Sequence, residues 1–261
     1  MLRNPIIDAM LDHRSVRKYK RKMVSDEIIE TVVRAGQQAP FAYQMYSVML
    51  SRNVKKNMFN APLLFTLCVD AHKLELIMKK RGWKTFTNDL TIFLFGVEDA
   101  SYMAQSMVVA GRSLGLGSCF IGFPLINPEG LARQYKLPKR VYPIVQLAMG
   151  YPAEEPSTRP RYPMDFVLFE GEYPKLDDKA IKKAMRTMDE GYLAQGYYKK
   201  ANLIIPLRGK RKETYTFKDY SWTEHISRKL GLWNDDLEAQ LKAIEKRGFD
   251  IKGGSKKRKK R

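Results

Sequence analysis

The segment that most constrains the fold runs from Gly96 to Gly122 and reads GVEDASYMAQSMVVAGRSLGLGSCFIG. Small or apolar residues recur in it at steps of three and four, which places them on one face of a helix. They are Val97, Ala100, Ala104, Met107, Gly111 and Leu114. Glu98 and Asp99 suit the positive end of a helix dipole, and Gly115 and Gly117 favour the backbone that ends a helix. We expect an almost fully buried helix that turns into a strand over 118–123, with its Met and Ala stripe used for core packing rather than for a cofactor.

The length and composition indicate one large globular domain, or one domain with an appendage. The chain has 261 residues, of which 44% are hydrophobic, enough for a sizeable core. Its apolar run over 61–69 is far shorter than the roughly 20 residues of a membrane helix. The N-terminal segment lacks the apolar core and cleavage site of a secretory signal, so we expect a cytoplasmic protein without membrane contact.

Cysteine and histidine usage bears on redox compartment and metal binding. Cys68 and Cys119 each lie inside an apolar, strand-like run, which predicts buried free thiols in a reducing compartment. The three histidines are isolated from one another and from any cluster of Cys, Asp or Glu. We therefore expect no metal site.

The charge is strongly positive. The formal net charge is +19, and six of these charges are in the C-terminal KKRKKR that follows Gly253-Gly254-Ser255. The remaining +13 would still attract anions such as a phosphorylated cofactor, an anionic membrane or a nucleic acid. For the tail, two interpretations remain open: a solubilising end, or a weak contact with a polyanion.

The order of the predicted elements indicates an α+β fold. Helices are predicted over 3–11, 26–38, 74–80, 127–135 and 177–199, with two weaker helices after residue 212. Strands are predicted over 46–51, 62–69, 118–123, 141–151 and 166–169. Because helices separate most of the strands, we expect a mixed, mostly antiparallel sheet flanked by helices, with an extended C-terminal arm.

The predicted organisation has three parts. Residues 1–175 form the core, 176–252 form a charged and aromatic helical arm without a second core, and 253–261 form a disordered basic tail.

Two clusters of cationic residues are candidates for a phosphate site. Arg14, Ser15, Arg17 and Lys18 lie within five residues, and Arg159 and Arg161 bracket Pro160. Guanidinium groups give paired, charge-assisted hydrogen bonds to a phosphate, and a serine hydroxyl adds a donor. Taken alone, HRSVRK is more typical of a solvated basic turn. The chain has neither of the two common glycine-rich phosphate loops, which argues against a Rossmann or P-loop site.

The order and spacing of several short motifs resemble those of the FMN-dependent nitroreductase family. These motifs are HRSVRKY, the AP that ends the second helix, GVEDASYMAQSMVVAGRSLGLGSCFIG, LPKRVYPIVQLAMGYP and RPRYP. The C-terminal MDEGYLAQGYY and SWTEHISRKLG are most similar to the oxygen-insensitive NADPH nitroreductases and NADPH-flavin oxidoreductases. In that group a long C-terminal arm embraces the partner subunit, so the resemblance implies a homodimer.

The resemblance also implies how FMN would be held. His13, Arg14 and Ser15 would lie along its ribityl-phosphate end, Arg17 near the pyrimidine edge, and Arg159 and Arg161 on the phosphate. Phe120, Ile121 and Gly122 would lie beside the isoalloxazine ring. The chemistry would take place at flavin N5, so no protein residue is required as a catalytic acid or nucleophile. Arg17 is the candidate for the positive charge near N1 and O2, where reduced flavin becomes anionic.

The chain departs from the family pattern near the second helix. After Ala39-Pro40 only Gln44 of the usual polar residues is retained, and it would contact the flavin ring edge. Phe41 and Tyr43 are candidates for stacking over the substrate pocket, although core packing is equally expected for Phe41. The connector over 52–61 replaces a helix that relatives use to cover the flavin. Phe123 stands where close relatives carry a second glycine and could crowd the pocket.

These features favour an oxidoreductase that uses NADPH or NADH to reduce nitroaromatics, quinones or free flavin through FMN by alternating hydride transfers. A cationic loop would favour NADPH, because its 2′-phosphate adds negative charge; Arg208 and Arg211 are its substrate-site candidates, beside Lys210 and Lys212. The alternative is a polyanion-binding protein or a flavin sensor on a reductase scaffold. It rests on the net charge and on aromatic residues interleaved with lysines that could stack on bases, namely Tyr197, Tyr198, Tyr215 and Trp222.

Overall fold

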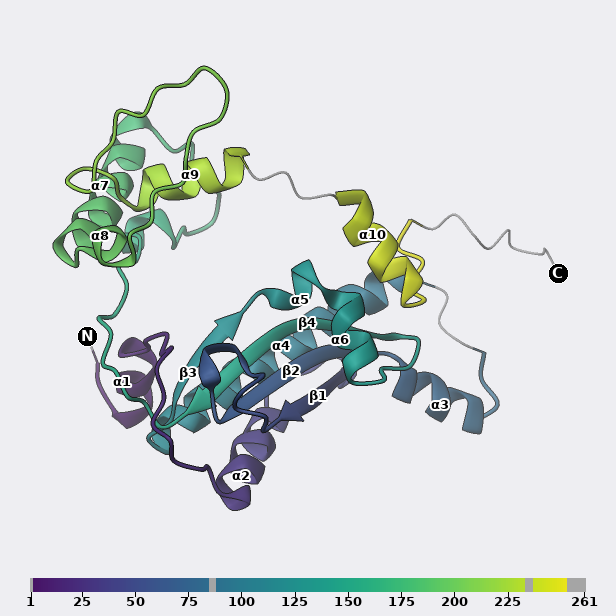
Figure 1. Cartoon of the computed structure of the whole chain (residues 1–261). Coiled ribbons are helices and arrows are strands. Elements are labelled where there is room, and N and C mark those ends of the chain that lie inside the picture. Colours follow the sequence, from purple (N-terminus) through teal and green to yellow (C-terminus); the bar gives the residue numbers. More distant parts are fainter. Residues whose placement is uncertain (1, 85–87, 233–236, 253–261) are drawn as a thin grey trace. The chain divides into compact units, whose positions relative to one another are not determined.

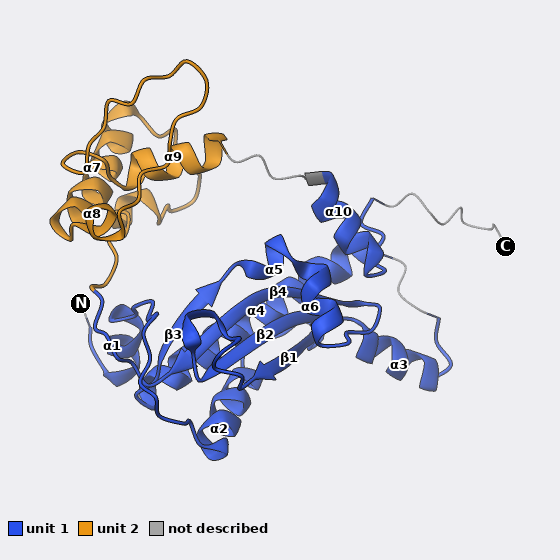
Figure 2. Ribbon diagram, viewed as in Figure 1, with its two compact units in different colours: residues 1–156, 236–261 blue, residues 157–235 orange. Residues whose placement is uncertain are grey.

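The computed structural model describes residues 2–84, 88–232 and 237–252. It divides the chain into two compact units (Figure 2): 1–156 together with 236–261 form unit 1, and 157–235 form unit 2. The KKRKKR tail, with its predicted disorder and polyanion contact, lies outside the described residues.

Unit 1 is built on a four-stranded antiparallel sheet (Figure 1). The strands are β1 (Tyr46–Ser51), β2 (Leu63–Asp70), β3 (Gly117–Ile121) and β4 (Val141–Gly150), in the order β1-β2-β4-β3. A parallel bridge joins Ser15 to Ser118 on the outer side of β3. The predicted α+β class and mostly antiparallel sheet are therefore confirmed.

Alternate residues of β2 face the two sides of the sheet. Leu63, Phe65 and Leu67 belong to the main hydrophobic core, which α2 (Asp26–Gln37) and α4 (Asp89–Ser113) complete on one face. On the other face, Cys68 packs with residues of α6 (Pro128–Gln134). Burial raises the pKa of the Cys68 thiol to about 12, and both cysteines are buried and unpaired, as the sequence predicted.

Helix α4 lies very close to its neighbours because of two glycines. A Cβ at Gly96 would come within 2.5 Å of Val69 Cγ1 in β2, and one at Gly36 of α2 would come within 2.6 Å of Met107 Cγ. The helix begins at Asp89, and the side chain of Asn88 caps it by accepting a hydrogen bond from Thr91 N. It is therefore longer than predicted. Glu98 and Asp99 therefore lie inside the helix, and their predicted position at its N-terminal end is wrong.

The remaining elements of unit 1 are short. They are α1 (Pro5–Leu11), the 3₁₀ turn η1 (Met58–Asn60), α3 (His72–Lys80), α5 (Phe123–Ile126) and α10 (Leu237–Lys246). The strand predicted over 118–123 ends at Ile121, because Phe123 begins α5 with Pro124 in its first turn. Phe123 packs beside Ile121, Leu64 and Ala148, on the face of the sheet opposite Phe120.

The segment after α10 is fastened to the sheet by buried arginines. Arg247 donates from Nε to the carbonyl oxygen of Val141 at 3.1 Å and from Nη2 to that of Leu137 at 2.6 Å. Arg140 bonds Glu75 and Asp89, and its guanidinium lies 4.5 Å from the centre of the buried Phe249 ring. The segment over 176–252, which the sequence analysis assigned to one arm, thus contributes to both units.

Unit 2 has a small aromatic core of its own. It contains η2 (Met164–Phe166), α7 (Asp178–Ala194), α8 (Tyr197–Ala201) and α9 (Trp222–Leu232). Met188, Tyr192, Tyr198 and Tyr220 are buried together. The prediction of an arm without a core is therefore wrong, because aromatic side chains supply the buried surface that aliphatic ones usually give.

Two further predictions for this region are wrong. The strand expected over 166–169 is absent from the described residues, where η2 and a turn take its place. The helix expected over 177–199 is interrupted at Gly196, whose φ of 58° is left-handed. In the part of the chain that is described, none of the helices has the length and apolar character needed to cross a bilayer.

We predict that Met107→Ala lowers the free energy of unfolding by about 2–5 kcal/mol, because Met107 is fully buried between α4 and α2 and the change leaves a cavity. Met23→Ala is the matched control, since this side chain is 82% exposed. Urea titrations of the two variants check this. Equal midpoints for both variants would contradict the packing described.

Candidate functional site

The HRSVR segment is joined to the edge of the sheet by its backbone. Val16 N donates to Ser118 O at 2.9 Å, next to the bridge between Ser15 and Ser118. The buried Val16 side chain fits against Gly117, where a Cβ would come within 2.7 Å of Val16 Cγ2. Two stretches that are a hundred residues apart in sequence, and that both carry predicted flavin contacts, therefore lie side by side.

Arg14 is held by carboxylates. Its guanidinium bonds Asp12 at 2.6 Å and Glu155 at 2.7 Å, and Asp12 also pairs with Arg112 of α4. The hydrogen bond from Arg14 is the largest cause that lowers the pKa of Asp12. Arg14 therefore lies next to the residue that bridges to β3, and its guanidinium is already bonded to two acids. His13 is half-buried just after the end of α1.

Arg17 is exposed and lies at the start of a basic stretch. Its backbone N–H and that of Lys18 both donate to Glu154 Oε1, at 2.5 and 3.0 Å. Its guanidinium lies 5.9 Å from the centre of the Phe59 ring, and Nη1 is 3.5 Å from Ser15 O. The backbone is thus fixed while most of the side chain faces solvent.

The edge strand β3 offers an open apolar surface. Phe120 is 40% exposed, and a Cβ added at Gly122 would meet nothing within 4 Å. Ile121 points to the opposite face and is buried among Ala61, Leu64 and Ala148. A ligand beside β3 could therefore contact the Phe120 ring and the Gly122 backbone, but the Ile121 side chain only slightly.

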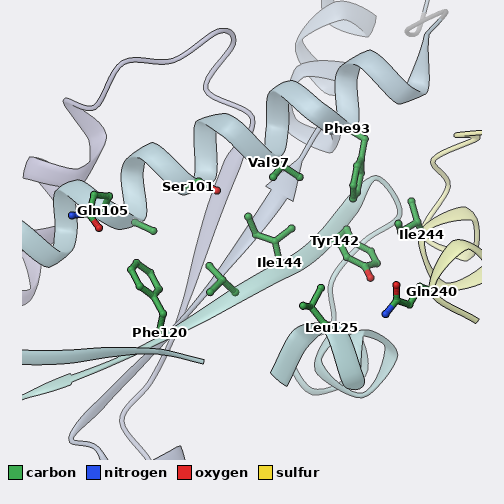
Figure 3. Close-up of a pocket in the computed structure, with 12 residues that line it drawn as sticks. Phe93, Val97, Ser101, Gln105, Phe120, Leu125, Tyr142, Ile144, Gln240 and Ile244 are labelled. Carbon is green, nitrogen blue, oxygen red and sulfur yellow. The ribbon is translucent and has the colours of Figure 1, made fainter. Parts of the chain in front are cut away.

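A pocket of about 480 Å³ lies between this strand and α4 (Figure 3). Phe120 and Ile144 from the sheet, and Val97, Ser101 and Gln105 from α4, face it. Leu125 of α5 and Gln240 and Ile244 of α10 also line it. Its lining is mostly apolar with a few polar groups, which is typical of small-molecule sites.

Asp99 organises the loop that follows α2, whereas the sequence analysis gave it only the role of a helix-dipole partner. The side chain is fully buried within α4, and it accepts hydrogen bonds from Ala42 N at 2.6 Å, Tyr43 N at 3.1 Å and Met45 N at 2.9 Å. Its position in the sequence could have indicated its burial. Asp99 lies three residues after Gly96 and four before Met103, which places it on the same buried face of α4.

The three residues predicted on this loop are all exposed. Gln44 has a left-handed φ of 55°, and it lies between two residues whose N–H groups Asp99 binds. Phe41 is 50% exposed, which favours the surface role considered for it over core packing. Tyr43 packs edge-on against Phe95 of α4, with ring centres 5.7 Å apart.

Arg159 and Arg161 belong to unit 2. Pro160 between them packs on α7, where a Cβ at Gly191 would come within 2.6 Å of Pro160 Cγ. Arg159 donates to Gln195 Oε1 at 2.8 Å, and its guanidinium lies 4.0 Å from the centre of the Tyr197 ring. Arg161 is exposed and bonds only main-chain carbonyls nearby, among the described residues.

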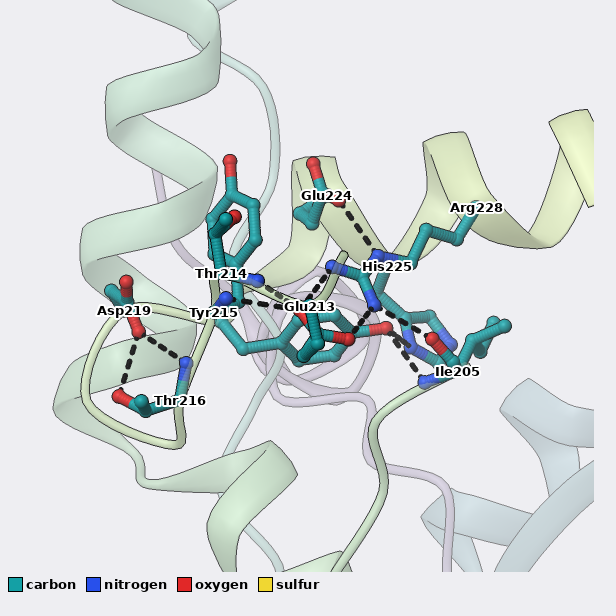
Figure 4. Close-up of polar contacts among 10 residues, drawn as sticks. Ile205, Glu213, Thr214, Tyr215, Thr216, Asp219, Glu224, His225 and Arg228 are labelled. Carbon is teal, nitrogen blue, oxygen red and sulfur yellow. Dashed lines mark hydrogen bonds and ion pairs between the residues drawn. The ribbon is translucent and has the colours of Figure 1, made fainter. Parts of the chain in front are cut away.

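Arg208 and Arg211 lie in a loop whose two ends are clamped by Arg228 of α9 (Figure 4). Arg228 is buried and donates from Nη1 to Ile205 O at 2.8 Å and to Glu213 Oε2 at 2.5 Å. It also bonds Glu224 Oε1 at 2.7 Å. Both ends of the loop are thus anchored, while its cationic side chains are exposed. The sequence analysis did not find Arg228.

The predicted site residues thus form two sets. Unit 1 carries His13, Arg14, Ser15, Arg17, Phe41, Tyr43, Gln44, Phe120, Ile121 and Gly122, and unit 2 carries Arg159, Arg161, Arg208 and Arg211. No group of three or more His, Cys, Asp or Glu side chains suited to a metal occurs among the described residues.

Comparison with known proteins gives the family. The Nitroreductase family pattern matches residues 10–52 and 48–151, which includes HRSVR, α4 and β3. The chain belongs to the Nitroreductase family.

The chain is also similar to individual reductases and to solved nitroreductase structures. A "CR(VI) reductase" of Pseudomonas sp. (strain G-1) is 34% identical over 181 residues, covering 64% of this chain and 74% of the relative. An "FMN reductase (NADPH)" of Bacillus subtilis is 28% identical over 229 residues, which cover 82% of this chain and 89% of the relative. The solved structure of B. megaterium NfrA1 aligns over 94% of this chain and 99% of its own chain, with 28% identity and a TM-score of 0.78.

We predict that Glu213→Gln lowers the melting temperature of this nitroreductase at neutral pH and that the difference from the parent protein shrinks in acid. The hydrogen bonds from Arg228 lower the pKa of Glu213 from 4.5 to about 2. The carboxylate therefore stabilises the folded form above pH 4.5, and this contribution is lost as the pH falls toward 2.

Thermal melts followed by circular dichroism between pH 7 and pH 2 measure this difference. Glu170→Gln is the control, since Glu170 is an exposed carboxylate of the same unit without an ion pair among the described residues. A Glu213→Gln difference that stays constant down to pH 2 would contradict the clamp.

Proposed function

We propose that the chain is an FMN-dependent oxidoreductase that passes hydride from NADPH or NADH to nitroaromatics, quinones or free flavin. The observation that carries the proposal is the family match over residues 10–151, because it spans both the HRSVR segment and the β3 edge. Relatives that bear the names of an NADPH-dependent FMN reductase and an oxygen-insensitive NADPH nitroreductase support the cofactor and the donor.

The residues present at β3 fit a flavin. Open space at Gly122 leaves room for a ring against the backbone, and the exposed Phe120 ring lies at the mouth of a mostly apolar pocket. Arg17, His13 and Ser15 supply polar and cationic groups at the same edge. Bound FMN would supply the hydride-accepting and hydride-donating chemistry.

The work of the chain in this proposal is to bind, orient and balance charge. Arg17 holds a positive charge where the reduced ring is anionic, and Gln44, fixed through the Asp99 hydrogen bonds, orients the ring edge. Ser15 and His13 face the phosphate end. Phe41 and Tyr43 cover the substrate, so water is excluded from the reacting face.

In this proposal the functional form is a homodimer in which the arm embraces the partner. The exposed cationic loop with Arg208 and Arg211 attracts the 2′-phosphate of NADPH. The polyanion-binding alternative gains no support from the family match, which assigns the core to a reductase family.

We predict that the purified protein is yellow or takes up FMN with a visible flavin band, and that Arg17→Gln weakens FMN binding about tenfold, because a charge-assisted contact to the ring edge is lost. Titration of the flavin-free protein, followed by flavin fluorescence, measures this affinity. Arg81→Gln is the control, since Arg81 is an exposed arginine outside the site. A colourless protein that binds no FMN would refute the proposal.

We predict that Arg211→Ala lowers the preference for NADPH over NADH about tenfold, measured as the ratio of the two kcat/KM values, because a cation facing the 2′-phosphate is removed. Arg186→Ala removes an equally exposed arginine from α7 and should leave the ratio unchanged. If both variants keep the parent ratio, the loop does not read the 2′-phosphate.

A further inference from the structure

A second cavity in unit 1 lies outside the proposed flavin contacts, apart from Arg17. It has a volume of about 1010 Å³ and runs between residues 17–24, which follow HRSVR, and residues 52–63, which connect β1 to β2. We call it the basic groove. Its cationic lining residues are Arg17, Lys18, Lys20, Arg21, Lys22, Arg52 and Lys55.

The charge of the basic groove is largely uncompensated. No Asp or Glu is among its lining residues within the described part of the chain. Of its cations, Arg52 pairs with Asp26, whereas Lys20, Arg21 and Lys55 form no ion pair with a described residue. Because cationic residues outnumber acidic ones along this concave space, the local potential is positive, and the groove favours a multiply charged anion.

The wall formed by the connector is well anchored. The buried Asn57 donates from Nδ2 to Ser51 O at 3.1 Å and to Ala61 O at 2.9 Å, so it ties both ends of the connector together. Phe59 and Asn60 adopt left-handed φ values of 60° and 49°, which are costly for residues other than glycine. This backbone holds the Phe59 ring in the groove, with the Arg17 guanidinium 5.9 Å from its centre.

We propose that the basic groove binds a small nucleotide that carries two or more phosphate groups. The phosphates would contact Lys20, Arg21 and Lys55, and the base would lie against Phe59, because cations and an aromatic face together match the two halves of a nucleotide. A space of this size suits a single nucleotide. The inference does not depend on the proposed redox reaction, since binding alone tests it.

The test is isothermal titration of the full-length, FMN-saturated protein with ATP, 2′,5′-ADP, adenosine and tripolyphosphate. We expect ATP or 2′,5′-ADP to bind, adenosine to bind far more weakly, and the affinity to fall with added salt. The triple variant Lys20→Gln, Arg21→Gln, Lys55→Gln should weaken nucleotide binding by about tenfold or more. The matched control is Lys79→Gln, Lys80→Gln, Arg81→Gln, which removes the same charge from exposed positions at the end of α3 and should keep the affinity.

The role of the aromatic wall needs a second variant. Phe59→Leu should weaken ATP binding but leave tripolyphosphate binding unchanged, because only the nucleotide has a base to stack. If the triple variant does not fold, Lys55→Gln and Arg21→Gln are measured singly and each should weaken binding.

The source of the nucleotide follows from competition. Tighter binding of 2′,5′-ADP than of ATP, with competition against NADPH, identifies the adenosine end of the electron donor, and the groove then replaces the loop with Arg208 and Arg211 as the site of the 2′-phosphate. Tighter ATP binding without competition identifies a separate nucleotide and leaves that loop as the NADPH contact. Either result supports the groove. The proposal would be overturned if neither nucleotide binds, or if the two triple variants lose nucleotide affinity equally. It would also be overturned if tripolyphosphate, or a single-stranded oligonucleotide titrated in the same way, binds more tightly than either nucleotide.

Discussion

The structure of unit 1 depends on a buried carboxylate in the middle of its longest helix. A charge inside a core is costly unless it is fully hydrogen-bonded, and Asp99 meets this condition with three backbone N–H groups from one loop. The bonds fix that loop against α4, and with it the exposed Phe41 and Tyr43 and the left-handed Gln44. One interaction therefore connects the packing of the core to the shape of a candidate substrate surface.

The fold of unit 1 also requires helices and strands to approach one another closely, and glycines at the contact points allow this. Gly36 and Gly96 allow α4 to lie against α2 and β2, and Gly117 allows the HRSVR segment to pair with β3. The HRSVR segment is thus brought to the β3 edge by a long-range contact and not by its order in sequence. The same N-terminal segment continues into the basic groove, so Arg17 belongs both to the proposed flavin contacts and to the lining of the groove.

The sequence predicts well what local periodicity and capping determine. The strand at 46–51 and the helix capped by Asn127 are found where expected, because alternation and an N-cap with proline are local signals. The resemblance identified the family, and the match over residues 10–151 confirmed it. The motifs do not predict the contacts of the individual site residues. The carboxylates of Asp12 and Glu155 around Arg14 are known only from the structure.

Other features depend on long-range contacts. The start of α4 was misjudged because the residues before Gly96 have no clear period, and Asp99 was taken as a dipole partner although its partners come from residues 42–45. The aromatic core of unit 2 was not expected, since tyrosines interleaved with lysines also suit a solvated surface. The clamp of Arg228 on Ile205 and Glu213 likewise joins residues that no local pattern relates.

Asp99 holds the loop after α2 in place through its three backbone hydrogen bonds. Amide hydrogen exchange of the native protein, resolved by residue, tests it most directly. We expect the N–H groups of Ala42, Tyr43 and Met45 to exchange as slowly as those in the middle of β2, because opening the loop would leave a buried carboxylate unpaired. Exchange of these three amides at the rate of an unstructured peptide, while β2 stays protected, would contradict it.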